Sequence, residues 1–279
     1  MPFGPGTAEL PEGVFTILRD LLHDRTGLWY DADKRDLLAD KLEGRLAARG
    51  LPSFLDYYYL LKYGSGADEE WPRVMDALSV QETYFWREFD QVRVLVEELL
   101  PRHAADNPSA PVRIWCAACA TGEEPLSIAM ALAEAGWFNR VGVEITATDG
   151  SHSALERARA GLYRERSFRS LPPALRDRYF TRQGDAWRVS PELHGRVRWA
   201  QVNLMDAAEV APHAQASYVF CRNVFIYFSP KAVEAVVRGF AQRMPRPGYL
   251  FVGASESLLK VTPDLELQEI GGAFVYVKQ

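Results

Sequence analysis

The pattern of hydrophobic residues changes near residue 110, and this change constrains the fold more than any other feature. Beyond it, short runs of β-branched and aromatic residues alternate with helical stretches, which predicts a parallel sheet with right-handed crossovers. Strands are predicted at 112–116, 143–148, 196–202, 218–221 and 249–252, and helices at 125–135, 153–160 and 230–244. The runs 265–270 and 273–278, joined by Gly271 and Gly272, predict an antiparallel hairpin that closes the sheet.

The first 80 residues have a different pattern, in which apolar residues recur at helical spacing. Helices are predicted over 11–27, 33–48 and 54–62, and again from residue 71. We therefore expect an all-helical N-terminal domain over residues 1–80 and an α/β domain over residues 81–279. The α/β pattern breaks between its second and third strands, where residues 179–193 alternate on both sides of Gly184. A small β insertion is expected there, at about 163–196.

Charge is distributed unevenly along the 279 residues. The whole chain has a net charge of -5, yet residues 151–200 contain 11 Arg and 5 acidic residues, a local +6 that leaves -11 elsewhere. An acidic partner would be attracted to that region, although a solvated arginine surface is the alternative. The negative net charge disfavours nucleic acid as a partner. Three cysteines, no secretory signal and no long apolar run lead us to expect a cytoplasmic protein that does not insert into membranes.

The first predicted strand runs into the loop CAACATGEEP, residues 116–125, which precedes a helix. The loop lacks the GxGxxG spacing of dinucleotide sites, and Glu123 and Glu124 would repel a pyrophosphate. Asp149 closes the second strand, where a carboxylate can accept hydrogen bonds from both ribose hydroxyls. A ribose without phosphate, together with an amino group or a sulfonium, describes S-adenosylmethionine. The alternative is that Glu124 and Asp149 merely cap helices.

Cys116 and Cys119 have the spacing of a thioredoxin-type redox pair and follow a strand. The helix that would lower the pKa of the first thiol begins only near Pro125, so the activating geometry is missing. A zinc site is not expected either, because the remaining cysteine is Cys221 and the five histidines are scattered. We expect the cysteines to be small packing residues, and no metal.

Two further segments carry polar residues beside aromatic ones. In QETYFWR, residues 81–87, Thr83 and Arg87 stand four apart, which predicts that they share one helix face. They could reach a carboxylate or a substrate, or anchor the helical domain to the sheet. In CRNVFIYF, residues 221–228, Arg222 and Asn223 follow the fourth strand, at the end of the sheet where ligands bind.

The second predicted helix has a basic stripe formed by Lys34, Lys41, Arg45 and Arg49, which fall on one narrow face. We expect this stripe to be either a docking surface for an acidic partner helix or a solvated face without a partner. We expect that nothing local neutralises its charge fully.

Several ordered motifs resemble one family, the chemotaxis receptor glutamate methyltransferases of the CheR family. They are the basic helix ending KLEGRLAARG, TYFWR, CAACATGEEPLSIAM, ATDGSHSALERARAGLY, the pair Asn203-Leu204, CRNVFIYF and GYLFVGASESL. The resemblance implies a Rossmann-like class I methyltransferase domain with a small inserted β-subdomain, preceded by a helical domain. It implies methyl transfer from S-adenosylmethionine to glutamate side chains in the cytoplasmic signalling domain of membrane chemoreceptors, with S-adenosylhomocysteine as product.

The resemblance also assigns site residues. The expected cofactor-binding positions are Gln81, Thr83, Arg87, Glu124, Asp149, Asn203, Leu204, Cys221, Arg222 and Asn223. Tyr227 is expected near the transferred methyl group, where it could orient the acceptor, and Arg87 could cradle a carboxylate. The stripe of Lys41, Arg45 and Arg49 is the expected receptor-docking surface. Gln81 stands where the family commonly has Asn, and Gly150 stands where Ile is frequent.

Two other functions are compatible with parts of the sequence. A methyltransferase acting on nucleic-acid bases usually has Pro-Pro and an aromatic residue after the Asn or Asp of the fourth strand, whereas Val224 and Phe225 follow Asn223 here. A non-catalytic module that binds S-adenosylmethionine and regulates a partner would have the same cofactor motifs, so turnover is needed to separate it from an enzyme.

Overall fold

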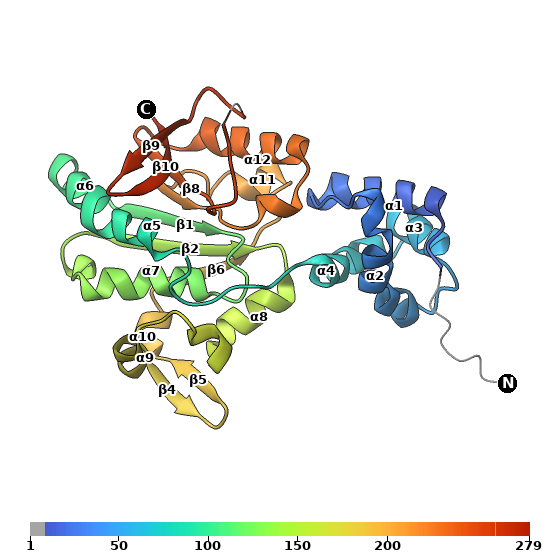
Figure 1. Cartoon of the computed structure of the whole chain (residues 1–279), viewed down its shortest axis with the longest axis horizontal. Coiled ribbons are helices and arrows are strands. Elements are labelled where there is room, and N and C mark those ends of the chain that lie inside the picture. Colours follow the sequence, from blue (N-terminus) through green and yellow to red (C-terminus); the bar gives the residue numbers. More distant parts are fainter. Residues whose placement is uncertain (1–8, 260) are drawn as a thin grey trace.

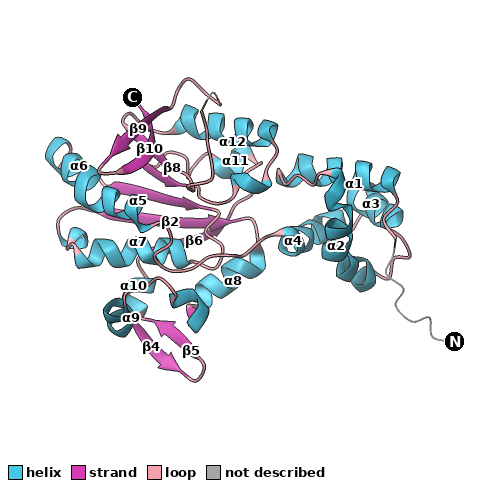
Figure 2. Ribbon diagram, in the orientation of Figure 1, coloured by secondary structure: helices cyan, strands magenta, loops and turns pink. Residues whose placement is uncertain are grey.

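The computed structural model of the chain describes residues 9–259 and 261–279. A small helical domain stands beside a larger α/β domain that has a separate β lobe (Figures 1 and 2). This arrangement confirms the predicted fold class. No helix in the described residues is both long and apolar enough to cross a bilayer.

The N-terminal domain packs its helices around one apolar core. Its elements are α1 (Glu12–Thr26), a 3-10 turn (Ala32–Lys34), α2 (Arg35–Arg49), α3 (Phe54–Tyr63) and α4 (Ala67–Leu78). The leucines predicted at helical spacing, among them Leu18 and Leu42, are fully buried together with Tyr57. Gly27 and Gly50 end α1 and α2 in the left-handed conformation, which glycine adopts without steric cost.

Glu70 of α4 lies at the centre of a buried ionic cluster. Its carboxylate, which is 0% exposed, accepts hydrogen bonds from Arg45 Nε and Nη2 at 2.8 Å, from Arg49 Nε at 2.6 Å and from Tyr57 Oη at 2.8 Å. Lys41 Nζ donates to the Leu78 carbonyl at 3.0 Å, near the end of α4. The expectation that nothing nearby neutralises the basic stripe was therefore wrong, because α4 supplies its partners across the domain.

The central sheet has the strand order β6-β2-β1-β7-β8-β10-β9. Its members are β1 (Val112–Ala117), β2 (Val143–Asp149), β6 (Val197–Gln201), β7 (Tyr218–Phe220), β8 (Gly248–Phe251), β9 (Glu266–Ile270) and β10 (Ala273–Lys278). The first five strands of that order pair in parallel, and β10 pairs antiparallel with β8 and β9. The carboxyl ends of the parallel strands consequently meet along one edge.

Helices bury both faces of the sheet, which is why its central strands are almost uniformly apolar. One face is covered by α5 (Phe89–Val94), a π-helical turn (Leu95–Leu99), α6 (Leu100–Asp106), α7 (Glu123–Glu134) and α8 (His152–Ala160), and the other by α11 (Ala207–Val210) and α12 (Pro230–Arg243) (Figure 1). Successive side chains of β1 point to opposite faces of the sheet. Ile114 lies on the face covered by α7, whereas Trp115 packs edge-on against Phe240 of α12. The helical stretch at residues 89–106 was not predicted.

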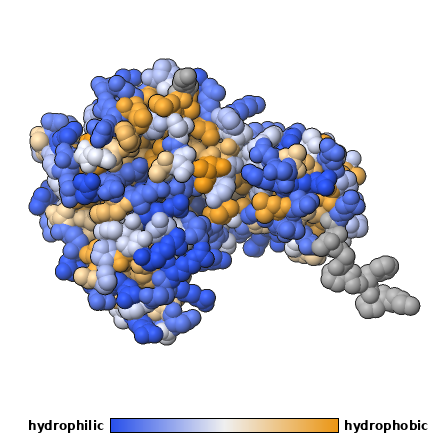
Figure 3. Space-filling view, in the orientation of Figure 1, coloured by the Kyte–Doolittle hydropathy of each residue, from blue (hydrophilic) through white to orange (hydrophobic). Residues whose placement is uncertain are grey.

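The β lobe is inserted between β2 and β6 along the chain. It contains β3 (Leu162–Arg164), a 3-10 turn (Glu165–Phe168), α9 (Pro173–Tyr179), β4 (Phe180–Gln183), β5 (Ala186–Val189) and α10 (Pro191–His194), with the antiparallel order β3-β5-β4. Phe85, from the segment that leaves the helical domain, packs in its core against Phe168 and Phe180 at ring-centroid distances of 5.2 and 5.0 Å. Hydrophilic residues dominate the visible surface of this lobe (Figure 3).

The two domains are joined by hydrogen bonds as well as by the chain. Trp29 N donates to the Tyr227 carbonyl at 2.9 Å, and His23 Nε2 lies 2.7 Å from Ser229 Oγ. Leu28 forms an isolated antiparallel bridge with Phe228. Hydrophobic residues are visible near this junction in Figure 3. The helical domain is therefore held against the carboxyl edge of the sheet, where it can contribute to a site.

We predict that Glu70→Ala destabilises the chain by up to about 3 kcal/mol, at the low end for a broken buried ion pair, because Arg45 and Arg49 keep some solvent access. Burial would raise the pKa of Glu70, but hydrogen bonds from Arg45, Tyr57 and Arg49 outweigh it and lower the pKa below 4.5. This contribution to stability is therefore present above pH 4.5 and is lost as the pH falls through the lower folded-state pKa.

Urea unfolding at pH 7 and in acid measures this effect, with Glu69→Ala of the same helix as the control, because Glu69 is exposed. Equal midpoints for Glu70→Ala and Glu69→Ala at pH 7 would contradict the importance of the cluster.

Candidate active site

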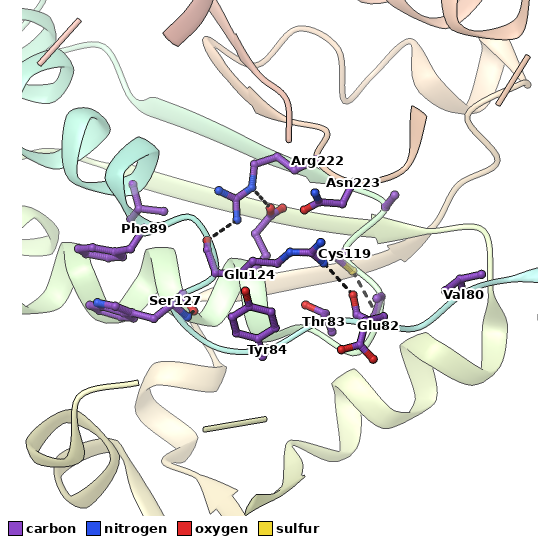
Figure 4. A pocket seen from close by; sticks show the side chains of 15 residues that line it. Val80, Glu82, Thr83, Tyr84, Phe89, Cys119, Glu124, Ser127, Arg222 and Asn223 are labelled. Carbon is purple, nitrogen blue, oxygen red and sulfur yellow. Dashed lines mark hydrogen bonds and ion pairs between the residues drawn. The ribbon is translucent and has the colours of Figure 1, made fainter. Parts of the chain in front are cut away.

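A two-lobed cleft lies at the carboxyl edge of the sheet. The lobes contain about 570 and 690 Å³ of space, part of it open to solvent, and they share the lining residues Val80, Ala118, Ala120 and Asn223, so they adjoin each other. Residues of the first lobe are drawn in Figure 4. The second lobe lies between the sheet edge and the helical domain.

Arg222 is the most completely bonded side chain of the first lobe. Its Nε donates to Glu124 at 2.7 Å, its Nη1 to the Glu88 carbonyl and Gln91 Oε1 at 3.0 and 3.1 Å, and its Nη2 to the Arg87 carbonyl at 2.8 Å. Figure 4 shows the guanidinium reaching across to Glu124. Arg222 therefore has a structural role, since it joins the end of β7, α7 and the segment at 87–91.

Glu124 therefore already has a cationic partner within the protein, the Arg222 guanidinium. Burial raises the pKa of its carboxyl group, and Arg222 opposes that rise. The carboxylate and the guanidinium are 12% and 3% exposed, so the pair is shielded from water and held rigidly. A cationic ligand group in this lobe would share Glu124 with Arg222, and an anionic ligand group would find Arg87 and Arg222 among the lining residues.

The segment that carries Thr83 and Arg87 is not helical, so our prediction of a shared helix face was wrong. Tertiary hydrogen bonds replace the helical ones: Phe85 N donates to the Ser167 carbonyl and Trp86 N to Ser127 Oγ. Thr83 and Arg87 nevertheless both line the first lobe.

Neighbouring contacts orient the Arg87 side chain. Its Nη1 donates to the Glu82 carbonyl at 2.9 Å, and its guanidinium lies over the Tyr84 ring at 5.6 Å. Arg166 and Arg169 of the β lobe pair with the Glu82 carboxylate. The inserted lobe therefore holds the segment that presents Arg87.

Asp149 lies in the second lobe, as the predicted ribose contact requires. Its Oδ2 accepts a hydrogen bond from Ala120 N at 2.9 Å and its Oδ1 from Ser151 N at 2.8 Å. Burial raises the pKa of the carboxyl group, while the two amide hydrogen bonds oppose that rise. The helix-capping alternative does not describe these acids: Ser151 caps α8, and the N-cap residue of α7 is Gly122, which has no side chain to form a cap.

Most of the other predicted cofactor positions also line the cleft. Gln81, Asn203, Leu204 and Tyr227 line the second lobe, and Asn223 lines both. Cys221 is the exception, because its side chain is fully buried in the apolar cluster beneath α12 and lines neither lobe. Cys221 was predicted only as a cofactor-binding position, and its side chain does not line the cleft.

The sequence did not predict that the helical domain lines part of the cleft. Residues of this domain line the second lobe, among them Thr26, Leu28, Met75 and Ser79. Asn203 Nδ2 also donates to the Arg25 carbonyl at 2.8 Å, which fixes this side chain between the domains. Nothing in the spacing of these residues distinguishes them from ordinary helix ends, so only the tertiary structure identifies them.

Glu256 was also missed, although it organises the loops around Asn223. Its carboxylate accepts hydrogen bonds from the backbone N–H groups of Gly253, Asn223 and Phe225 at 2.6, 2.8 and 2.7 Å. It thereby ties the loop after β7 to the loop after β8. Glu88 supports the same region, since its carboxylate accepts from Asn223 Nδ2 at 3.3 Å. An acidic residue in the small-residue run GASES was the only sequence signal.

Left-handed backbone conformations gather around the cleft. In the described part of the chain, the non-glycine residues with positive φ are Trp86, Glu88, Ala118, Ala120 and Asn223, at 67°, 47°, 62°, 47° and 58°. All except Glu88 line a lobe, and Glu88 is in contact with Asn223. Such residues are uncommon in proteins and concentrate at functional sites.

Comparison with known proteins gives two family matches. Residues 81–271 match the model described as CheR methyltransferase, SAM binding domain, and residues 14–79 match CheR methyltransferase, all-alpha domain. Chemotaxis protein methyltransferase 2 of Vibrio cholerae is 32% identical over 267 residues, covering 95% of this chain and 92% of its own. The chemotaxis protein methyltransferase of Klebsiella aerogenes is 34% identical over 264 residues, covering 93% and 88%.

We predict that Cys116, Cys119 and Cys221 are unreactive in the native protein. All three are buried, and burial raises the pKa of each thiol well above its usual value, so almost no thiolate is present at pH 8. A colorimetric thiol reagent should detect no thiol in the time in which the unfolded chain reacts completely. Rapid reaction of Cys116 or Cys119 in the folded protein would instead support the redox-pair interpretation.

Proposed function

The chain belongs to the CheR methyltransferase family, and from this premise we propose that it esterifies glutamate side chains in the cytoplasmic signalling domains of chemoreceptors. The family assignment makes it a methyltransferase that uses S-adenosylmethionine. Relatives named chemotaxis protein methyltransferases over nearly the whole chain support the receptor as partner and the cytoplasm as the place of action. The observation that carries the proposal is the single cleft that brings the expected polar residues together.

The donor set of the cleft fits S-adenosylmethionine, which supplies an electrophilic methyl group when bound. Asp149 has both oxygens held by backbone amides and lines the second lobe, which suits a ribose diol. In the first lobe, Glu124 and Arg222 form a charge pair beside Thr83 and Arg87, which suits a group carrying both an amine and a carboxylate. We propose that these residues hold the cofactor, with Asn203 and Leu204 on the wall next to the helical domain.

The proposed chemistry needs no general base. A glutamate carboxylate is ionised at neutral pH and is itself the nucleophile. The chain therefore contributes mainly by aligning the acceptor and by removing it from water. Arg87 is held by the Glu82 carbonyl and the Tyr84 ring, so its guanidinium can cradle a carboxylate with little loss of entropy. Tyr227 lines the second lobe, and we propose that it orients the acceptor.

Incubation with methyl-labelled S-adenosylmethionine and receptor cytoplasmic fragments tests the proposal. Label should enter the fragment and be released by mild alkali, because an ester is hydrolysed and an N-methyl group is not. Substitution of the acceptor glutamates by alanine in the fragment is the control. Alkali-stable label, or cofactor binding without any transfer, would contradict the proposal and favour a different acceptor or a regulatory module.

We predict that Asp149→Ala weakens binding of S-adenosylhomocysteine by tenfold to a hundredfold, the effect of about 1.5 to 3 kcal/mol for hydrogen bonds to a charged group. Calorimetric titration measures this affinity directly. Glu156→Ala is a matched control, because Glu156 lies on the adjoining helix α8 with its side chain 66% exposed. Unchanged affinity of a folded Asp149→Ala variant would remove Asp149 from the site.

We infer that the acidic partner docks beside the β lobe. A third, open cavity is lined by Arg157, Arg164 and Arg166, and it shares Gln81 with the second lobe and Thr83 with the first. Its position next to the cleft and the local charge of +6 over residues 151–200 favour an acidic helix there.

The stripe of Lys41, Arg45 and Arg49 is a second proposed docking surface for the acidic partner. Its arginines are 24% and 30% exposed, but Glu70 already neutralises part of their charge. Arg45 is a poor choice for charge reversal, because a glutamate there would face Glu70 across the core of the domain.

We predict that Arg164→Glu raises the KM for receptor fragments about fivefold, equivalent to roughly 1 kcal/mol for an exposed ion pair, without changing cofactor affinity. The wild-type rate should also fall as salt is added. Arg238→Glu is the control, because Arg238 is a half-exposed residue of α12, on the other face of the sheet. Equal KM values for Arg164→Glu and wild type at low ionic strength would leave the stripe as the candidate surface.

A further inference from the structure

Asp76 of α4 links the helical domain to the helix that follows β2. Its Oδ1 accepts hydrogen bonds from Ser151 Oγ at 2.7 Å and from Ser153 N at 3.0 Å. Ser153 N belongs to the first turn of α8, whose N–H groups have no partner within the helix. A carboxylate from one domain therefore completes the capping of a helix that belongs to the other.

Ser151 connects Asp76 to Asp149. The serine is 0% exposed, and its backbone N–H donates to Asp149 Oδ1 at 2.8 Å. Its hydroxyl oxygen accepts from Ala154 N at 3.1 Å and from Gln81 Nε2 at 3.2 Å, so both lone pairs are used. The single hydroxyl proton is then available for Asp76, and the direction of this 2.7 Å hydrogen bond is fixed.

Gly150 leaves room for Met75 where the two domains meet. A Cβ atom at Gly150 would lie 3.3 Å from Met75 Sδ and Cε, so a side chain there would require the end of the Met75 side chain to shift by a few tenths of an ångström. Met75 precedes Asp76 and lines the same lobe as Asp149. The glycine between Asp149 and Ser151 thus lets the end of α4 lie against the loop that carries the predicted ribose contact.

We propose that Asp76 is a positioning residue for the cofactor: it fixes Ser151, and Ser151 fixes the carboxylate of Asp149. The helical domain then helps to position a cofactor-binding residue, in addition to lining the cleft. The inference rests on the proposed ribose contact of Asp149, but it does not depend on which protein accepts the methyl group. Loss of Asp76 removes one of the hydrogen bonds that hold the Ser151 hydroxyl and the side-chain acceptor of Ser153 N, so the backbone N–H that anchors Asp149 Oδ1 is held less firmly.

Calorimetric titration with S-adenosylhomocysteine tests this role. Asp76→Ala should weaken binding about tenfold, the size of one hydrogen bond to a charged group. Turnover at saturating cofactor should change much less, because Asp76 touches no reacting group. Asp76→Asn keeps an oxygen that can accept from Ser151 and Ser153, so it should recover most of the lost affinity.

The matched control is His23→Ala, which breaks another hydrogen bond of 2.7 Å between the same two domains but has no bonded route to Asp149. It should lower the melting temperature and leave the affinity nearly unchanged. The double variant Asp76→Ala/Ser151→Ala should bind no more weakly than the weaker single variant, because both changes break one connection.

The inference would be overturned by wild-type affinity in a folded Asp76→Ala variant, by an equal loss in His23→Ala, or by strictly additive losses for Asp76→Ala and Ser151→Ala. Weakened binding by Asp76→Ala together with unchanged binding by Asp149→Ala would also overturn it, since no route through Asp149 would then exist. Failure to methylate receptor fragments would contradict only the proposed acceptor, because the affinities measured by titration do not require an acceptor.

Discussion

A buried guanidinium holds the cleft together. Removing Arg222 from water has a large desolvation cost, so the charge must find a counter-ion and its N–H groups must find acceptors. Glu124 supplies the negative charge and one acceptor. The carbonyls of Arg87 and Glu88 and the side chain of Gln91 supply the remaining hydrogen-bond acceptors. The observed arrangement of the end of β7, the start of α7 and residues 87–91 satisfies all of them. The position of Arg87, and with it the shape of the first lobe, follows from that constraint.

Local patterns in the sequence predicted the parts of the fold that depend on local physics. Strands such as β1 and helices such as α2 were found because alternation and helical spacing are visible within a dozen residues. The predicted helix face of Thr83 and Arg87 failed because Phe85 N bonds to Ser167, which is 82 positions away in the sequence. The basic stripe was misjudged for the same reason, since Glu70 lies on a different helix.

The proposed site residues differ in the same way in how far the sequence reveals them. Asp149 and Glu124 could be proposed from the sequence because a carboxylate at the end of a strand or at the start of a helix has few ordinary roles. Glu256 was not, because its partners are backbone N–H groups, which every sequence supplies. The contribution of Met75 and its neighbours was equally invisible, since it requires two domains to be placed against each other.

The left-handed residues around the cleft have an evolutionary consequence. Each costs roughly 1 to 3 kcal/mol relative to a relaxed backbone, and the surrounding structure supplies that energy when the chain folds. Alanine, asparagine and glycine tolerate such angles far better than valine, isoleucine or threonine. Ala118 and Ala120 are therefore expected to drift only toward glycine, asparagine or aspartate over generations. During evolution, these residues at the rim of the cleft should be substituted more slowly than other residues of similar exposure, even where their side chains touch no ligand.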